Sequence, residues 1–294
     1  MADQPAALPS VALLGTGIMG AGMGRNMLLA GLPLRAWNRT AAKVQALKPD
    51  GAQVAQTPAE AVADAQVIVT IMADADAVAG AMTAAAPGLH EGQIWAQVST
   101  VGLPGVAALA RLASGHGLVF VDSPVLGTRQ PAEQGTLIVF AAGPDAAKAA
   151  VQPVFEAIGS KTVWLGPEPG TASRLKLVVN SWVLAVMSGV AEAIALARGL
   201  GVDPQLFVDA VSGGPLDCPY LQTKAGAILK NDFSPSFTAG MAAKDARLIV
   251  EAAGSAGVRL DVAMAAAERL RRAVELGHAQ EDMAATYFAS FDDR

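Results

Sequence analysis

The chain has 294 residues, of which 52% are hydrophobic and 16% charged, a composition that excludes an intrinsically disordered protein. The 21 basic and 26 acidic side chains give a formal net charge of −5, which leaves no basic excess for binding a nucleic acid. One cysteine and three separated histidines provide neither an intrachain disulfide nor a zinc ligand set. We therefore expect a metal-free protein of about two domains. We expect it in the cytoplasm, because its first residues carry no cationic segment typical of a secretory signal.

The first half of the chain alternates short apolar runs with alanine-rich segments of helical length. Such alternation is typical of a doubly wound α/β domain with a mostly parallel sheet. Helix starts fall between the runs, as at Thr57, which can cap a helix that has Pro58 in its first turn and Glu60 completing a capping box. Pro104 marks another predicted helix start. The predicted strands cover residues 11–14, 34–37, 67–72, 94–98, 119–121, 137–141 and 162–165.

The second half contains no strand-like run and is predicted to be all helical. We expect an N-terminal domain over residues 1–170 and a helical domain over 171–294, joined directly by a long helix at about 171–200. The segment 177–197 approaches membrane length, but Asn180 and Glu192 lie inside it and a charge is costly in lipid. We therefore predict a helix buried in protein, with a membrane span as the alternative. The further helices are expected at about 204–211, 217–230, 237–255, 259–277 and 280–291.

A glycine-rich motif directly follows the first predicted strand and opens a helix, and it reads Gly15-Thr16-Gly17-Ile18-Met19-Gly20. In this context the spacing is typical of a dinucleotide-binding turn. One glycine makes the tight turn, one lets the pyrophosphate approach the backbone, and one lets helix and strand pack closely. The alternative is a glycine-rich turn that only connects the two elements. We predict that these six residues bind the cofactor.

The second predicted strand ends in Asn38, Arg39 and Thr40, where a site for NAD would have an acidic residue for the ribose hydroxyl. Asn38 does not repel a phosphate, Arg39 can pair with one, and Thr40 can donate a hydroxyl. The strand end therefore predicts NADP as the cofactor. The alternative is that Arg39 is an ordinary solvated arginine.

Two polar residues lie near the start of the long predicted helix, among apolar neighbours. Lys176 and Asn180 are four residues apart and so share one helix face. If Lys176 faces a cleft, it can donate a proton, with Asn180 orienting the lysine or a substrate. If it does not, its side chain extends to solvent. The spacing alone leaves both interpretations open.

The loop 122–135 follows a predicted strand, and loops at this end of parallel strands bind ligands in α/β proteins. Gly127 and Thr128 can offer backbone and hydroxyl donors to a carboxylate. We include Ser123 and Leu126 in the same predicted substrate-binding segment. A loop that serves only as a connector is the alternative.

In this order and at these separations, the motifs resemble the β-hydroxyacid dehydrogenase family, which includes 3-hydroxyisobutyrate dehydrogenases and glyoxylate/succinic semialdehyde reductases. The resemblance covers roughly residues 11–291. It looks closest to the glyoxylate/succinic semialdehyde reductase branch, through Asn38-Arg39-Thr40, the segment GTRQPAEQG from Gly127, and LKLVVN from Leu175. The resemblance implies a Rossmann domain, an interdomain helix, and a helical domain that forms homodimers or homotetramers.

The resemblance also implies roles for single residues. Lys176 matches the catalytic lysine, Asn180 a substrate-binding asparagine, and the loop 122–135 the segment that holds a substrate carboxylate. Ser99 and Thr100 match a Ser-Thr pair of the family, in which Thr100 approaches the nicotinamide. The remaining cofactor-binding positions are Met72 and Lys244.

Two departures from the family pattern bear on the substrate. Leu126 stands where the family usually has a serine, and Val179 where some branches have an asparagine. We expect an NADP-dependent oxidoreductase that reduces a small aldehyde or keto acid, or oxidises the matching hydroxy acid. The alternatives are an imine reductase-like enzyme, which Leu126 favours and Lys176 opposes, and a non-catalytic NADP-binding protein.

Overall fold

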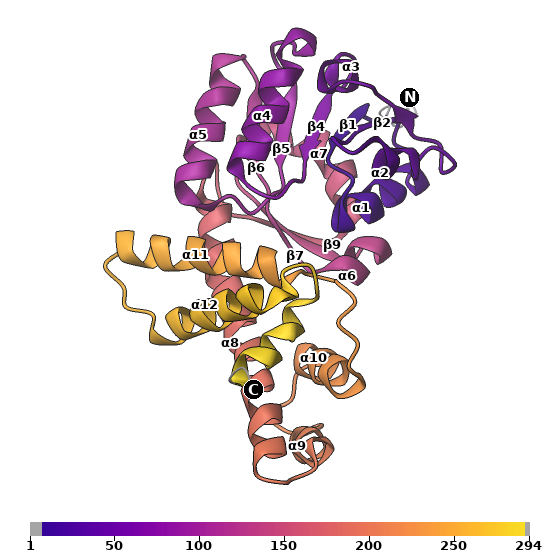
Figure 1. Ribbon diagram of the computed structural model, residues 1–294. Coiled ribbons are helices and arrows are strands. Elements are labelled where there is room, and N and C mark those ends of the chain that lie inside the picture. The colour runs from indigo at the N-terminus through magenta and orange to yellow at the C-terminus, as the bar shows by residue number, and fades with distance from the viewer. Residues whose placement is uncertain (1–7, 292–294) are drawn as a thin grey trace. The chain divides into compact units, whose positions relative to one another are not determined.

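The computed structural model describes residues 8–291 and divides into two compact units, Met1–Lys176 and Leu177–Arg294 (Figure 1). Helix α8, Thr171–Gly199, passes through this division. A domain boundary at residue 170 therefore stays a prediction. Each unit is described below by itself.

The N-terminal unit contains a sheet of six parallel strands in the order β3-β2-β1-β4-β5-β6. The order reverses direction between β1 and β4, as it does in doubly wound dinucleotide-binding folds. This arrangement confirms the predicted fold class. In chain order the strands are β1 (Val11–Leu14), β2 (Leu34–Trp37), β3 (Gln53–Val54), β4 (Val67–Thr70), β5 (Ile94–Gln97) and β6 (Val119–Asp122).

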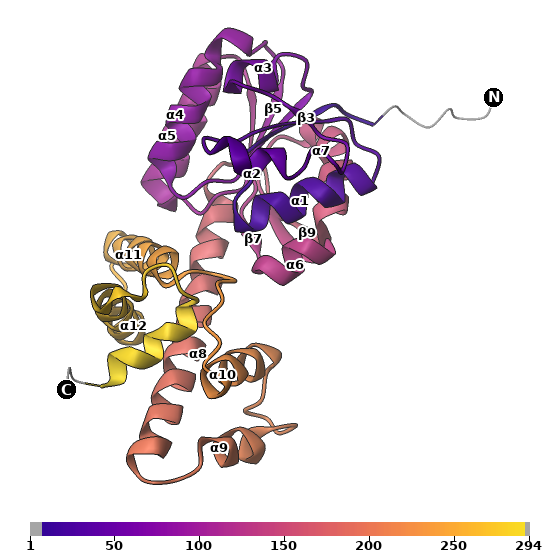
Figure 2. The same cartoon turned by 45° about the vertical axis from the view of Figure 1, so that its right-hand side comes forward.

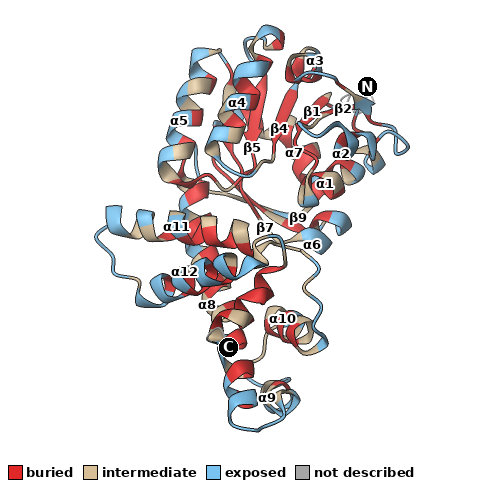
Figure 3. Ribbon diagram, in the orientation of Figure 1, coloured by how far each residue is buried: buried red, intermediate tan, exposed pale blue. Residues whose placement is uncertain are grey.

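Helices cover both faces of this sheet, and Figures 1 and 2 both show α4 and α5 on one side and α1 and α7 on the other. Successive residues of β1 alternate between the two faces. Leu13 packs in one buried cluster with Met23 of α1, and Leu14 in the other with Met82 of α4. The central strands are therefore buried on both faces, as Figure 3 shows. The helices of this unit are α1 (Ile18–Leu29), α2 (Ala41–Gln45), α3 (Pro58–Val62), α4 (Ala75–Ala85), η1 (Ala86–Gly88), α5 (Gly102–Gly115), α6 (Arg129–Gln134) and α7 (Asp145–Ile158).

Helix α3 begins where the sequence predicts it. The backbone N–H of Glu60 donates to Thr57 Oγ1 at 3.1 Å, which is the capping bond. Glu60 Oε2 accepts from the backbone N–H of Gln56 at 2.8 Å, one residue before the cap. Pro104 likewise lies in the first turn of α5, which begins at Gly102.

A second, three-stranded sheet follows, although the sequence suggested a single one. Its strands are β7 (Val125–Leu126), β8 (Leu137–Ala141) and β9 (Gly159–Trp164), with β7 antiparallel and β9 parallel to β8. A bridge between Asp122 and Ala142 joins the two sheets. The two-residue strand β7 is too short for a recognisable alternation of apolar and polar residues.

The described part of the C-terminal unit is helical throughout, as predicted, and α11 and α12 pack together. Two predicted elements differ in detail. The helix expected over 259–277 ends as α12 at Ala273 and continues as one π turn, in which Gly277 has a φ of 96°. The segment expected as a helix over 280–291 forms a 3₁₀ helix. The elements are α8, α9 (Pro204–Val211), α10 (Pro219–Lys230), α11 (Ala239–Ser255), α12 (Asp261–Ala273), η2 (Val274–His278) and η3 (Met283–Ser290).

A buried ion pair connects α10 to the residue that precedes η3. Lys224 Nζ lies 2.6 Å from Asp282 Oδ1, and both side chains are 4% exposed. The other oxygen of Asp282 accepts from the hydroxyl of Ser236 at 2.7 Å. Burial alone would raise the pKa of Asp282, but the ion pair and the hydrogen bonds hold it below its ordinary value.

Helix α8 is the one helix of the described residues that is long and apolar enough, by length and composition, to cross a membrane. Only 39% of the 18-residue stretch of α8 that is apolar enough to cross a membrane is buried inside the protein. The helix expected to be buried in protein therefore has an exposed apolar face within the single chain, on which Val178, Trp182 and Leu196 are 65%, 69% and 62% exposed.

Candidate functional site

The turn after β1 is built by glycines that have different physical roles. Gly15 has a φ of +110°, and a Cβ there would lie 2.1 Å from the carbonyl oxygen of Ile71. A Cβ on Gly20 would lie 2.2 Å from the carbonyl oxygen of Gly15, so close packing of α1 on the turn requires this glycine. A Cβ on Gly17 would meet no atom within 4 Å. Two glycines therefore serve the chain's own packing, and the third borders open space at the start of α1.

Polar groups beside this turn are arranged to receive a ligand. The backbone N–H of Thr16 donates to Asn38 Oδ1 at 3.0 Å, and Asn38 Nδ2 donates to the carbonyl of Thr40 at 3.1 Å. Asn38 thereby ties the glycine turn to the end of β2. Thr16 Oγ1 is buried and has no hydrogen-bond partner. A buried hydroxyl without a partner, next to open space and a helix N-terminus, fits a bound phosphate group.

Arg39 lies two residues after the end of β2 and is exposed. Since β2 lies beside β1 in the sheet, Arg39 belongs to the same edge as the glycine turn. Within residues 8–291, no acidic side chain pairs with Arg39. Its charge is therefore available to a ligand.

The ends of β4 and β5 form the next part of this edge. Ser99 Oγ accepts from the backbone N–H of Met72 at 2.8 Å, which brings the two segments together. The amide of Gln97 donates to the carbonyl of Ser99 at 2.9 Å and accepts from its N–H at 2.7 Å. These bonds fix the backbone that leads into Thr100. The sequence did not single out Gln97, because its partners become neighbours only in the fold.

The segment after β6 holds the residues predicted to bind substrate. Ser123 is fully buried, and its hydroxyl donates to the carbonyl of Gln97 at 3.3 Å. Leu126 is half-buried in β7 opposite Ile138. Gly127 has a φ of +135° and packs so closely on Leu137 that a Cβ would lie 2.6 Å from it. The hydroxyl of Ser123 is thus used inside the protein, whereas Leu126 is partly accessible.

Thr128 occupies the N-cap position of α6, and its side chain makes no capping hydrogen bond. Arg129 pairs with Glu133 one helical turn later, at 2.8 Å. The hydroxyl of Thr128 is therefore not used to cap α6, whereas the charge of Arg129 is paired within α6.

Lys176 is the last residue of the N-terminal unit and is only 7% exposed. Few lysines are this deeply buried without a paired or functional role. The burial argues against the interpretation of Lys176 as an ordinary surface charge.

In the C-terminal unit, Asp245 joins two of the predicted residues. Its Oδ2 accepts from Asn180 Nδ2 at 2.8 Å, and its Oδ1 lies 2.8 Å from Lys244 Nζ. Asn180 and Asp245 are 5% and 3% exposed. Asp245 was not among the predicted site residues, although an acidic residue beside Lys244 in an alanine-rich helix was the available signal.

Comparison with known proteins agrees with this architecture. Residues 10–166 match the family model described as the NAD binding domain of 6-phosphogluconate dehydrogenase. Residues 170–289 match the NAD-binding domain of NADP-dependent 3-hydroxyisobutyrate dehydrogenase. The chain is 32% identical over 279 residues to glyoxylate/succinic semialdehyde reductase 2, chloroplastic, of Arabidopsis thaliana, covering 94% of this chain and 78% of that protein.

The chain belongs to the β-hydroxyacid dehydrogenase family.

Two further similarities fit this membership. The solved structure of 3-hydroxyisobutyrate dehydrogenase from Salmonella typhimurium has a TM-score of 0.88 and 24% identity, covering 95% of this chain and 99% of that chain. The likeness to it shows the shared fold. The chain is also 32% identical over 282 residues to the cytokine-like nuclear factor N-PAC of Xenopus tropicalis, covering 95% of this chain but 53% of that protein. It therefore spans about half the length of that relative.

As a β-hydroxyacid dehydrogenase family member, the chain is an oxidoreductase with an NAD(P)-binding domain. The glycine turn and Thr16 fit such a dinucleotide, because they combine open space with a buried hydroxyl that has no partner. In the N-terminal unit, the residues predicted to bind the cofactor follow the carboxyl ends of β1, β2, β4 and β5. This is the edge at which open α/β sheets bind ligands.

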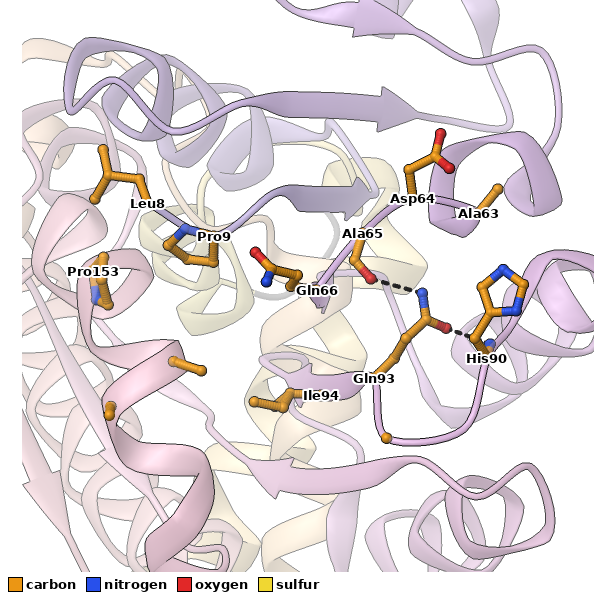
Figure 4. A pocket seen from close by; sticks show the side chains of 13 residues that line it. Leu8, Pro9, Ala63, Asp64, Ala65, Gln66, His90, Gln93, Ile94 and Pro153 are labelled. Carbon is orange, nitrogen blue, oxygen red and sulfur yellow. Dashed lines mark hydrogen bonds between the residues drawn. The ribbon is translucent and has the colours of Figure 1, made fainter. Parts of the chain in front are cut away.

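A cavity of about 710 Å³ lies elsewhere, at the edge where the strands begin (Figure 4). Its lining includes Pro9 and Gln66, which precede β1 and β4. The amide of Gln93 donates to the carbonyls of Val62 and Ala65 at 2.8 and 2.7 Å. Within the described chain, none of the buried side-chain atoms without a partner belongs to this lining. The cavity therefore does not contribute to the candidate site, despite its size.

Proposed function

We propose that this chain is an NADP-dependent reductase of a small aldehyde or keto acid, in which Lys176 is the general acid. The observation that carries the proposal is the burial of Lys176, with 7% exposure, at the end of a unit that also contains the dinucleotide turn. An ammonium group held in so buried a position can donate a proton to the carbonyl oxygen of a bound substrate. The same charge would stabilise negative charge as it develops on that oxygen.

Bound NADPH would supply the hydride that reduces the carbonyl carbon. Gly17 and Thr16 would hold the pyrophosphate, and Arg39 would pair with the 2′-phosphate of the adenosine. Thr100 would approach the nicotinamide, and Met72 and Lys244 would complete the cofactor site. Lys176 Nζ would then give its proton to the carbonyl oxygen, so that a hydroxyl group results.

A substrate that carries a carboxylate would be held by the segment after β6. Gly127 and Thr128 offer donors there, and Thr128 Oγ1 is not used as a helix cap. Asn180 would contribute an amide whose orientation Asp245 fixes. The Arabidopsis relative is named for glyoxylate and succinic semialdehyde, and both are small carbonyl acids. Leu126 favours a second candidate, reduction of an imine, because it offers an apolar contact in place of a hydroxyl.

We further propose that the protein is a cytoplasmic homodimer or homotetramer. The exposed apolar side chains of Val178, Trp182 and Leu196 on α8 support self-association, since large exposed apolar groups gathered on one helix are typical of interfaces.

Cofactor preference is the first test of the proposal. The parent should bind NADPH roughly 10- to 100-fold more tightly than NADH, because a charge-assisted contact to the phosphate is worth about 1.5–3 kcal/mol. Arg39→Ala should remove most of this preference and leave NADH affinity unchanged. Arg35→Ala is the matched control, because Arg35 lies in β2, four residues before Arg39, and pairs with Asp64 at 3.0 Å. Equal dissociation constants of the parent for both cofactors would contradict the assignment.

A screen of NADPH oxidation with glyoxylate, succinic semialdehyde, bulkier carbonyls and cyclic imines distinguishes the candidate reactions. The proposal predicts turnover of small carbonyl acids. Turnover of imines alone would favour imine reduction, and no turnover with any compound in spite of NADPH binding would favour a non-catalytic protein.

A further inference from the structure

Helix α8 begins without a capping side chain of its own. Gly170, with a φ of +94°, precedes its first residue, Thr171. The first N–H groups of any helix lack partners within the helix. Here a carboxylate from a distant strand accepts two of the bonds at this end. Asp122, the last residue of β6, accepts through Oδ2 from the backbone N–H groups of Gly170 and Ser173, both at 2.9 Å.

The second oxygen of Asp122 accepts from the hydroxyl of Ser173 at 2.7 Å. Asp122 is fully buried and Ser173 is 4% exposed, so water does not compete for these bonds. Burial raises the pKa of Asp122, and the bonds from Ser173 and Gly170 partly oppose this. Because three donors bind one carboxylate, the first turn of α8 can neither shift along the helix axis nor rotate about it without breaking hydrogen bonds.

The backbone of Asp122 is itself fixed by both sheets. Its N–H donates to the carbonyl of Ala142 and its carbonyl accepts from the N–H of Ala142, both at 2.9 Å. The next N–H, of Ser123, donates to the carbonyl of Gln97 in β5 at 2.8 Å. Asp122 is therefore a rigid point from which the helix start is held.

Lys176 lies three residues after Ser173 in α8, so the two side chains are neighbours on one helix face. We propose that Asp122 is a positioning residue for the reaction, which sets the direction of the Lys176 ammonium through the three hydrogen bonds at the start of α8. The inference rests on the proposed role of Lys176 as the general acid. Since Asp122 also begins the segment 122–135, one buried carboxylate sets the geometry of both the proton donor and the carboxylate-binding loop.

Asp122→Asn tests this directly, because it keeps the size of the side chain. The amide can accept at only one of its two polar atoms, so the three donors at the helix start can no longer all bond as they do in the parent. We expect kcat to fall about 10- to 100-fold, since a misplacement of about 1 Å can have effects of this size. The dissociation constant of NADPH should stay within about twofold, because the glycine turn is formed by other elements. The solvent deuterium isotope effect on kcat should rise as proton transfer becomes slower.

Ser173→Ala is a milder variant that removes one bond and leaves both backbone bonds to Asp122. It should lower kcat by about three- to tenfold, again with a raised solvent isotope effect. Ser236→Ala is the matched control, because it also removes a serine hydroxyl from a buried carboxylate, that of Asp282, at 2.7 Å. This control should leave kcat and the isotope effect at the parent values.

The outcomes separate positioning from a purely structural cap. If Asp122→Asn and Ser173→Ala lower the melting temperature but keep the parent kcat per NADPH-binding site and the parent isotope effect, the inference is overturned. If Asp122→Asn does not fold, Ser173→Ala decides on the same readouts. Failure of the proposed function looks different, since Lys176→Met would then retain the parent kcat.

Discussion

Replacing Gly17 by alanine should weaken cofactor binding and leave the fold intact. Its φ of −73° and ψ of −159° are open to alanine, and a Cβ there would meet no atom within 4 Å. Alanine is a poorer N-cap than glycine, but it also restricts the unfolded chain by about 0.4–1 kcal/mol. These effects oppose each other, so the free energy of unfolding should change by less than about 1 kcal/mol. A methyl group where the pyrophosphate meets the backbone should cost about 1–3 kcal/mol, or roughly 5- to 150-fold in NADPH affinity.

Gly20→Ala should do the opposite. A Cβ there would lie 2.2 Å from the carbonyl oxygen of Gly15 and 3.0 Å from a side-chain carbon of Ile71, so the turn must move. Overpacking of this kind costs about 1–3 kcal/mol and should lower the melting temperature by several degrees. Gly80→Ala in α4 is the control, because a Cβ there also meets nothing within 4 Å. It should be at least as stable as the parent and bind NADPH equally well.

The assay combines NADPH titration by fluorescence with a thermal melt of each variant. If Gly17→Ala binds NADPH as tightly as the parent, the open space beside Gly17 is not where the dinucleotide lies. If Gly20→Ala melts at the parent temperature, the close contact between α1 and the turn does not constrain this position.

Two further predictions concern the substrate and the pH dependence of stability. Leu126→Ser introduces a hydroxyl whose hydrogen bond to a substrate carboxylate is worth about 1.5–3 kcal/mol. The variant should therefore have a higher kcat/KM for glyoxylate relative to bulky carbonyls, measured by NADPH oxidation. An unchanged ranking of these substrates would show that Leu126 does not line the substrate site. Asp282→Asn leaves Lys224 buried without its partner and should cost about 3–5 kcal/mol at neutral pH. Because the pKa of Asp282 is lowered in the folded protein, its contribution is complete above the unfolded value of 3.8 and is lost as the pH falls below it. The difference in melting temperature between parent and Asp282→Asn should therefore be constant above about pH 5 and shrink as the pH falls below 3.8, and an equal difference above and below that value would contradict the assignment.

The strands of the six-stranded sheet were mostly predictable from the sequence, because a parallel strand covered on both faces reads as a continuous apolar run. Strands β1 and β2 begin and end where the apolar runs do. Strands β3 and β7 were not predicted, because each has two residues and no period can be recognised in so short a segment. The second sheet was missed for a related reason, since pairing of β7 with β8 depends on contacts that form only in the fold.

The candidate site was predictable where chemistry is local in sequence. Three parts of the site can each be recognised from a few neighbouring residues: the glycine turn, the end of β2, and the pair Lys176 and Asn180. The residues that fix them do not, because their partners are distant. Asp122 bonds Ser173 across 51 positions, and Asp245 bonds Asn180 across 65. In the sequence, Asp122 is only an acidic residue at the end of an apolar strand, and Asp245 only an acidic residue in an alanine-rich helix. Neither position indicates its distant partner.

The measurement that tests the account most directly is single-turnover oxidation of NADPH with glyoxylate or succinic semialdehyde, followed by absorbance in the parent and in Lys176→Met. The account predicts that both proteins bind NADPH with dissociation constants within a few-fold of each other, because Lys176 acts on the carbonyl and not on the cofactor. It predicts that hydride transfer in Lys176→Met is slower by about 10²- to 10⁴-fold, the usual contribution of a general acid. A variant that binds NADPH and oxidises it at the parent rate would show that the proton comes from another group, and would contradict the assignment of Lys176.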